Sequence, residues 1–237
     1  MLARLIDLVL PPRCPGCGEV VAAQGRFCPG CWTSLRFLAP PWCAGCNRPF
    51  EHDRGAGVRC AGCLATPPRH AGIRAAVAYG DVARTVALKL KYAGRTAYAD
   101  VAAGAMHRLV PDDAGLLVPV PLHRTRLWWR GYNQAALIAA ALSRRSGVPA
   151  DVMVLERRRA TPSLRGHDPA ARRRAVRGAF AVEPRRRERL DGRHVVLVDD
   201  VHTTGATTDA CVATLLAGGA SRVTILAWAR VLDDRTD

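Results

Sequence analysis

Lysine, aromatic residues and long apolar runs are all scarce in this sequence of 237 residues. Lys89 and Lys91 are the only lysines, so arginine supplies 33 of the 35 basic residues. Aromatic residues make up 5% of the chain and hydrophobic residues 49%, which predicts a core of aliphatic strands and alanine-rich helices. The apolar residues 1–10 carry Arg4 and Asp7 and stop at two prolines, well short of the ~20 residues that a membrane span needs. We therefore expect no membrane span, and a short amphipathic helix at residues 1–10.

The amino terminus also lacks the features of an export signal. Residues 1–10 have neither an uninterrupted apolar stretch nor a small-residue cleavage site, and Cys14 follows shortly after them. We therefore expect a cytoplasmic protein, in which cysteine thiols stay reduced.

Acidic residues are too few to balance the arginines. The chain has 20 acidic and 35 basic residues, which gives a formal charge of +15 and an isoelectric point near 10.4. Codon bias in a GC-rich genome accounts for arginine in place of lysine, but not for the net surplus. Because the guanidinium group binds phosphate through two parallel hydrogen bonds and stacks on bases, the surplus favours nucleic acid or a phosphorylated ligand as a partner.

Eight of the nine cysteines precede residue 64 and form four C-x-x-C pairs. The pairs are Cys14/Cys17, Cys28/Cys31, Cys43/Cys46 and Cys60/Cys63. Two such pairs supply one tetrahedral sulfur site, so the segment predicts two structural zinc sites. We favour pairing in chain order, although an interleaved pairing stays open, as do disulfides and an iron–sulfur cluster. The ninth cysteine, Cys211, is expected to pack in a helix.

The proline-rich residues 65–70 predict a boundary between a cysteine-rich module, residues 1–66, and an α/β domain, residues 72–237. From there on strand-like and helix-like runs alternate, and residues 194–229 have the order strand, helix, strand. This pattern predicts a mainly parallel sheet with helices on both faces and a ligand at the carboxyl ends of its strands. We expect the first strand of this unit to run from His194 to Val198.

Residues 195–208, VVLVDDVHTTGATT, carry the strongest chemical pattern in the chain. A buried strand leads to Asp199 and Asp200, whose carboxylates can accept hydrogen bonds from ribose hydroxyls. The residues that follow combine hydroxyls, a glycine and a helix start, a combination that favours a bound phosphate: Thr203, Thr204, Gly205, Ala206 and Thr207. The alternative is a simple helix cap, which accounts for one polar residue but not for two acids and a threonine-glycine run.

The same stretch resembles the 5-phosphoribosyl 1-pyrophosphate (PRPP) motif of type I phosphoribosyltransferases. Together with the four cysteine pairs and VPVPLHRTRLWWRGYNQA at 118–135, the chain resembles the ComF family of competence proteins over essentially its whole length. The resemblance implies that Asp199 and Asp200 contact the ribose, that residues 203–207 hold the 5′-phosphate, and that Mg²⁺ bridges pyrophosphate and ribose.

The resemblance also implies cations near the pyrophosphate, for which Arg124, Arg126 and Arg130 are the candidates, and a loose match of Lys89 and Lys91 to the family pattern. Its implied partners are single-stranded DNA and a DNA-uptake helicase.

The chain departs from the family pattern at two places between residues 160 and 176. Its T-x-x-Q motif is reduced to Thr161-Pro-Ser163, and Ala175 stands where the family has asparagine. Residues 157–193 form an arginine-rich insertion, which is either a solvated face or a phosphate-binding surface. Trp128 and Trp129 are either stacking partners for bases or core residues.

Three functions follow from these features. The first is a PRPP-binding protein of the phosphoribosyltransferase type that handles single-stranded DNA during DNA uptake. The second is an active phosphoribosyltransferase with an unknown acceptor in nucleotide metabolism or salvage. The third is a PRPP-sensing regulator that does not bind DNA.

Overall fold

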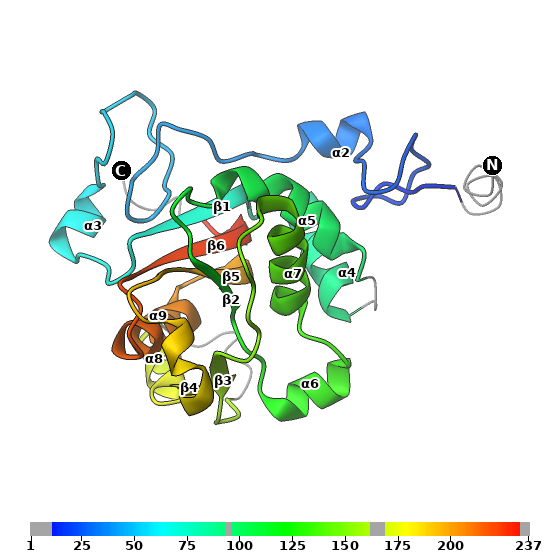
Figure 1. The fold of residues 1–237 in the computed structure, drawn as a ribbon. Coiled ribbons are helices and arrows are strands. Elements are labelled where there is room, and N and C mark those ends of the chain that lie inside the picture. The colour runs from blue at the N-terminus through cyan, green and yellow to red at the C-terminus, as the bar shows by residue number, and fades with distance from the viewer. Residues whose placement is uncertain (1–10, 93–95, 162–168, 233–237) are drawn as a thin grey trace.

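A four-stranded parallel sheet forms the centre of the computed structural model, which describes residues 11–92, 96–161 and 169–232 (Figure 1). The strand order across the sheet is β1–β6–β5–β2. In chain order the strands are β1 (Gly72–Ala78), β2 (Leu116–Pro119), β5 (His194–His202) and β6 (Arg222–Arg230). The two central strands, β5 and β6, pair from His194–Arg222 to His202–Arg230. Most of their residues are buried, as expected for parallel strands covered on both faces.

Strand β5 is longer than the sequence predicted. It continues past Val198 through both aspartates to His202, because β6 stays paired beside it: Asp199 lies opposite Ala227, and Val201 lies opposite Ala229. The two acids are therefore part of the strand, and consecutive side chains of a strand point to opposite faces.

Helices cover both faces of the sheet, as the alternating pattern predicted (Figure 1). On one face lie α4 (Asp81–Tyr92), α5 (Tyr98–Met106) and α7 (Gln134–Ser146), which enclose a core that includes Trp228. On the other face lies α9 (Ala206–Ala217), packed with Leu197 and Ile225. None of the helices in the described ranges is both long and apolar enough to cross a bilayer.

A small accessory unit packs beside α9. It consists of the antiparallel strands β3 (Leu155–Arg157) and β4 (Phe180–Val182) with helices α8 (Pro169–Val176) and η2 (Pro184–Arg189). Most of the described arginines in its basic runs are exposed, which agrees with a solvated face: Arg158, Arg159, Arg173, Arg174, Arg185, Arg186 and Arg187. Arg157 differs, because it lines the cleft described below.

From residue 11 to residue 66, the cysteine-rich region contains two single-turn helices, α2 (Pro29–Thr33) and α3 (Ala61–Ala65). The chain between them runs along the outer edge of β1 and hydrogen-bonds to it. These bonds are Ala78 N to Arg36 O (2.8 Å), Leu38 N to Ala76 O (3.0 Å), Ile73 N to Gly45 O (2.8 Å) and Ala75 N to the side chain of Asn47 (2.8 Å). The segment thus occupies the position of a further strand beside the sheet.

Candidate functional site

A cleft of about 440 Å³ opens at the carboxyl ends of β2 and β5. All seven loop and acid residues singled out in the sequence line it: Asp199, Asp200, Thr203, Thr204, Gly205, Ala206 and Thr207. Of the three candidate arginines, Arg126 and Arg130 line the cleft, whereas Arg124 is exposed at the first turn of α6 (Arg124–Arg130). The cleft therefore brings together two carboxylates, the start of a helix and at least two guanidinium groups.

The loop between β5 and α9 has the form of an anion site. Gly205 has φ 81°, a backbone conformation that suits glycine, and is the N-cap of α9. Because glycine has no side chain to cap the helix, the first amides of α9 are left facing the cleft, where they favour an anion. Thr203 and Thr204 are exposed there. This geometry does not fit the alternative of a threonine or aspartate cap.

Two buried side chains that the sequence reasoning missed support this loop. The hydroxyl of Thr208 donates to the carbonyl of Gly205 (3.0 Å) and lies 3.3 Å from Nδ1 of His202. Burial, followed by the charge of Arg230, lowers the pKa of His202 to about 3. His202 is therefore neutral at physiological pH and acts as a packed support beneath the loop.

The side chain of Asp200 is 4% exposed and lies toward α4 and α7. Lys91 on α4 places Nζ 2.6 Å from Oδ2, and Gln134 on α7 donates from Nε2 to Oδ1 at 3.4 Å. Burial alone would lower the pKa of Lys91, but the charge of Asp200 and its hydrogen bond raise it overall. The carboxylate of Asp200 thus forms a buried ion pair with a protein cation.

Asp199 has no such cation in contact within the described chain. Its Oδ1 accepts a hydrogen bond from the amide of Asp200 (2.9 Å). Burial, followed by the charge of Asp200, raises its pKa well above the usual value. The charge of Asp199 also acts on Cys211 of α9, on the other face of the sheet. Burial, followed by this charge, raises the pKa of the Cys211 thiol. The two neighbouring acids therefore differ in their partners as well as in the face of the sheet to which they point.

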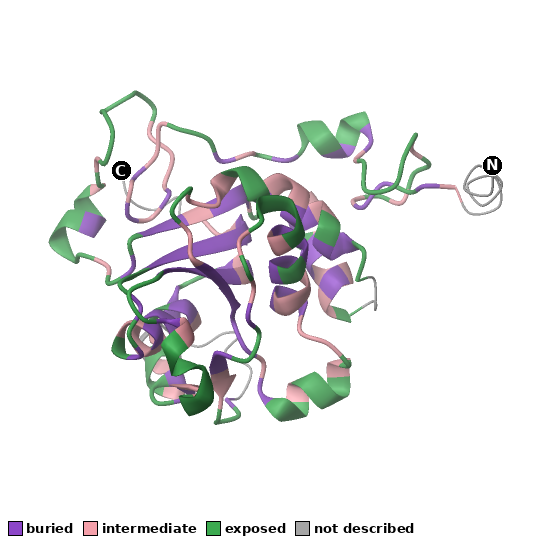
Figure 2. Cartoon of the chain, viewed as in Figure 1, coloured by how far each residue is buried: buried purple, intermediate pink, exposed green. Residues whose placement is uncertain are grey.

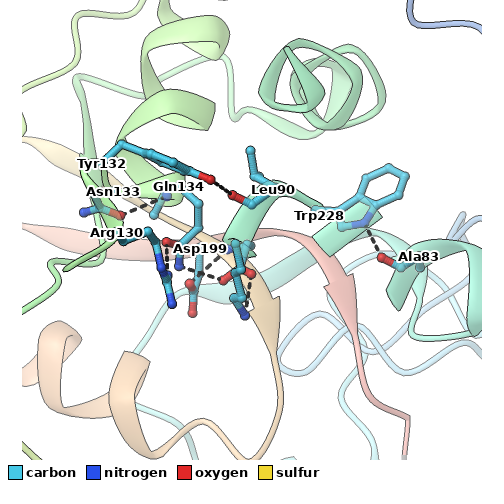
Figure 3. Close-up of polar contacts among 11 residues, drawn as sticks. Ala83, Leu90, Arg130, Tyr132, Asn133, Gln134, Asp199 and Trp228 are labelled. Carbon is cyan, nitrogen blue, oxygen red and sulfur yellow. Dashed lines mark hydrogen bonds and ion pairs between the residues drawn. The ribbon is translucent and has the colours of Figure 1, made fainter. Parts of the chain in front are cut away.

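A chain of contacts extends from Asp200 to the rim of the cleft (Figure 3). Gln134 accepts a hydrogen bond at Oε1 from Arg130 (2.6 Å), and the Arg130 guanidinium lies 5.2 Å from the ring centroid of Tyr92. Arg130 is therefore oriented by Gln134, which also contacts Asp200, and is not a free surface cation.

The RGYNQ segment fixes the helices around the cleft (Figure 3). Asn133 is the N-cap of α7, accepting from the amide of Ala135 (3.0 Å) and donating to the carbonyl of Val120 (3.0 Å). The hydroxyl of Tyr132 donates to the carbonyl of Leu90 on α4 (2.6 Å). These contacts tie α7 to β2 and α4, which positions Gln134 and Lys91 on Asp200.

Arg157 and Thr161 also line the cleft, and the sequence gave no specific sign of it. The carbonyl of Thr161 accepts from Arg126 (3.0 Å), and its hydroxyl accepts from Arg157. Burial, followed by the charge of Arg126, lowers the pKa of Arg157, and Nε of Arg157 is buried with no hydrogen-bond partner among the described residues. The two guanidinium groups form a basic wall of the cleft. Ser163, in the altered T-x-x-Q motif, lies outside the described residues.

The eight early cysteines form two sets of four, with the sulfur atoms of each set within 4.8 Å of one another. The sets are Cys14, Cys17, Cys28 and Cys31, and Cys43, Cys46, Cys60 and Cys63. The predicted pairing in chain order is therefore confirmed. Four sulfur ligands in a closed set fit a tetrahedral structural zinc ion.

In each set, main-chain amides favour the thiolate form of one cysteine, Cys14 in the first set and Cys43 in the second. The amide of Cys60 donates to the sulfur of Cys43 (3.1 Å), and that of Cys28 donates to Cys14 (3.3 Å). Burial opposes ionisation of Cys14 and Cys43, yet amide hydrogen bonds bring the pKa of each down to about 6. The first set is also joined to the α/β domain, because Nζ of Lys89 donates to the carbonyls of Pro15 and Gly16, both at 3.0 Å.

Magnesium would be held differently from zinc. Asp199 and Asp200 are the only acids that line the cleft in the described ranges, and one oxygen of Asp200 already contacts Lys91. Mg²⁺ in nucleotide sites usually keeps one or two protein carboxylates and takes its other ligands from water and phosphates. The residues therefore fit a magnesium ion that is bound largely by its phosphate ligand.

The fold and cleft define a protein of the phosphoribosyltransferase type that carries two four-cysteine ribbons. Family models agree, since residues 5–68 match a double zinc ribbon domain and residues 132–236 match a phosphoribosyl transferase domain. The chain is 31% identical to the DNA utilization protein YhgH of Escherichia coli over 202 residues, which cover 80% of this chain and 84% of that protein. The chain therefore belongs to the ComF family, as its sequence motifs predicted.

The chain is also similar to a second curated relative and, more weakly, to a solved structure. The chain is 30% identical to competence protein F of Haemophilus influenzae over 206 residues, 82% of this chain and 86% of that protein. Among solved structures, the glutamine PRPP amidotransferase of Bacillus subtilis matches 59% of this chain and 30% of its own, at 19% identity and a TM-score of 0.39. That structural likeness is too weak to carry a conclusion about function.

Proposed function

We propose that the cleft binds PRPP with Mg²⁺, in a cytoplasmic protein that handles single-stranded DNA during DNA uptake. One observation carries the first part: the acids of β5 and the uncapped start of α9 open into the same cleft. A 5′-phosphate on the amides and hydroxyls of residues 203–207 leaves the ribose above β5, where Asp199 and Asp200 can accept its hydroxyl protons in hydrogen bonds.

The remaining phosphates would face the basic wall. Arg126 and Arg157 offer guanidinium groups without a carboxylate partner in the described chain, and an anion between them would relieve their mutual repulsion. When bound, Mg²⁺ would neutralise charge on the pyrophosphate. Lys91 forms an ion pair with Asp200, which orients this carboxylate as an acceptor for the ribose.

The DNA part of the proposal is supported by surface chemistry and by the names of the relatives. Helix α6 exposes Trp128 and Trp129 at 83% and 87%, next to Arg130 at the rim of the cleft. Exposed tryptophans beside arginines suit the stacking of unpaired bases. The relatives named above are a DNA utilization protein and a competence protein. A DNA-uptake helicase is the partner that this role would require.

Calorimetry of PRPP and Mg²⁺ with the zinc-replete protein tests the ligand. We expect saturable, Mg²⁺-dependent binding that is lost in the Asp199→Asn/Asp200→Asn variant and kept in Asp112→Asn, an acid exposed away from the cleft. Binding that persists in the double variant, or its absence in the wild type, contradicts the proposal. Pyrophosphate release, measured in parallel with a panel of bases and amines, decides between an active transferase and a sensor.

Anisotropy of a labelled single-stranded oligonucleotide tests DNA handling. We expect binding that weakens as salt rises and that is reduced in the Trp129→Ala/Arg130→Ala variant. No anisotropy change near physiological salt would end this part of the proposal and leave a PRPP-binding regulator.

A further inference from the structure

A second large groove, of about 880 Å³, lies between the first four-cysteine segment and the helices α5 and η1 (His107–Leu109). We call it the ribbon groove. It shares no lining residue with the cleft. The two cysteine segments lie on different sides of the molecule in Figure 1, so that only the first, next to α4 and α5, borders this groove.

The floor of the ribbon groove is aromatic. The ring centroids of Trp32 and Phe37 are 4.7 Å apart, and those of Phe27 and Trp32 are 6.5 Å apart, with interplanar angles near 47° in both pairs. Phe27 and Phe37 pack against the domain core, whereas Trp32 is 55% exposed. The rings of Phe27 and Phe37, which are packed against the core, therefore support the exposed indole of Trp32. A tryptophan that served only for packing would instead be buried by these neighbours.

The rim of the groove is strongly basic. Four arginines line it: Arg13, Arg26, Arg108 and Arg145. Asp100 is the one acidic residue among the described lining residues, and it is paired with Arg144 at 2.9 Å. None of the four arginines has a carboxylate within ion-pair distance in the described chain. The rim therefore carries an uncompensated positive charge around an apolar floor.

We propose that the ribbon groove binds single-stranded nucleic acid, with a base stacked on Trp32 and the backbone phosphates on the four arginines. Arginine provides both a phosphate ligand and a planar surface for bases, and Arg108 already lies 5.9 Å from the ring centroid of Phe37. The bases of a duplex are stacked on one another and cannot present their faces to a recessed floor, so single strands bind in preference. This assignment deepens the DNA handling proposed above and does not depend on the PRPP cleft.

The test measures anisotropy of a fluorescent oligothymidylate with the full-length, zinc-loaded chain. Replacing Trp32 by alanine is expected to weaken binding about fivefold or more, the effect of losing one stacked base. Leu64→Ala is the control, because it removes a 66% exposed apolar side chain that also follows a cysteine, Cys63, in the other four-cysteine set. Because Trp32 follows the ligand Cys31, the zinc content of this variant is measured as well.

A second variant, Arg108→Gln/Arg145→Gln, lies on the α/β domain and avoids the metal sites. It is expected to reduce the slope of log affinity against log salt by about 1.4, since each phosphate contact on a single strand contributes about 0.7. The Arg185→Gln/Arg187→Gln variant makes the same charge change at exposed arginines of η2 and is expected to alter the slope far less.

The outcomes separate this inference from the proposed function. Wild-type binding that is equal for duplex and single strand, or unchanged in both groove variants, overturns the assignment while leaving DNA handling in place. No oligonucleotide binding by the wild type defeats both. Loss of binding in the groove variants with unchanged calorimetric binding of Mg²⁺ and PRPP supports the assignment.

Discussion

Replacing Lys91 by methionine would leave the carboxylate of Asp200 buried without its cation. The Asp200 side chain is 4% exposed, that of Lys91 26%, and the two charged atoms lie 2.6 Å apart. The remaining hydrogen bond, from Gln134 at 3.4 Å, is long. Removing one partner of a buried pair costs about 3–5 kcal/mol, and because Lys91 is partly exposed we expect a loss near the lower end, about 3 kcal/mol of unfolding free energy.

The opposite substitution, Asp200→Asn, has a smaller expected cost. It leaves a lysine that can turn its amine toward water, so we expect a loss of about 1 kcal/mol. The Lys91→Met/Asp200→Asn double variant contains no charge at the site. We therefore expect it to be more stable than Lys91→Met alone, so that the second change partly rescues the first.

Urea unfolding of the zinc-replete variants near neutral pH, followed by circular dichroism, measures these differences. If Lys91→Met costs less than about 1 kcal/mol, or if the two losses simply add in the double variant, Lys91 and Asp200 do not form the stabilising buried ion pair described above. In that case Lys91 does not orient the carboxylate of Asp200 for the ribose hydroxyls either.

Three further outcomes are expected. Elemental analysis should find two zinc ions per chain, and one each after Cys14→Ser or Cys43→Ser, which remove a ligand from different sets. The pKa of His202 is about 3 in the folded protein and about 6.5 in the unfolded chain, so the unfolding free energy decreases as pH falls below about 6.5, by about 1.4 kcal/mol at pH 5.5. In urea unfolding of His202→Asn, this part of the pH dependence should be absent. Gly205→Ala should lower stability by about 1–2 kcal/mol and PRPP affinity more than about tenfold, whereas Gly80→Ala, in open space, should change neither.

The sequence predicted those parts of the molecule that depend on local pattern. The cysteine spacing predicted two four-thiol sets, and the run of Val and Leu before two acids placed the phosphate loop at the carboxyl end of a buried strand. Gly205 and the threonines around it are contiguous, so their common position at the cleft could be predicted from a motif.

Contacts between distant parts of the chain could not be predicted. The neutralisation of Asp200 by Lys91 joins residues that are more than a hundred positions apart, and nothing in the LKLKY run specifies that partner. Arg157 has the same local context as the exposed Arg158 and Arg159, yet strand β3 directs it alone into the cleft. The end of β5 was placed too early because pairing with β6, and not polarity, decides where that strand stops.

The choice between exposed and buried tryptophans was also decided by tertiary structure. Trp128 and Trp129 lie on the short helix α6, which stands away from the sheet and is largely exposed in Figure 2. Trp228, by contrast, is buried on β6 and donates from its indole nitrogen to the carbonyl of Ala83 (3.1 Å, Figure 3). Composition gave no means of distinguishing these positions.

The segment that runs along β1 gives the cysteine-rich region a protective role in assembly. It satisfies the outward amides of Ile73, Ala75 and Ala78, groups that an open sheet would offer to a neighbouring molecule. A chain truncated to begin at residue 72 would present this bare margin and associate sheet to sheet. The cysteine-rich region therefore covers a sheet edge as well as holding metal ligands, and we expect the α/β domain to be less soluble when it is separated from this region.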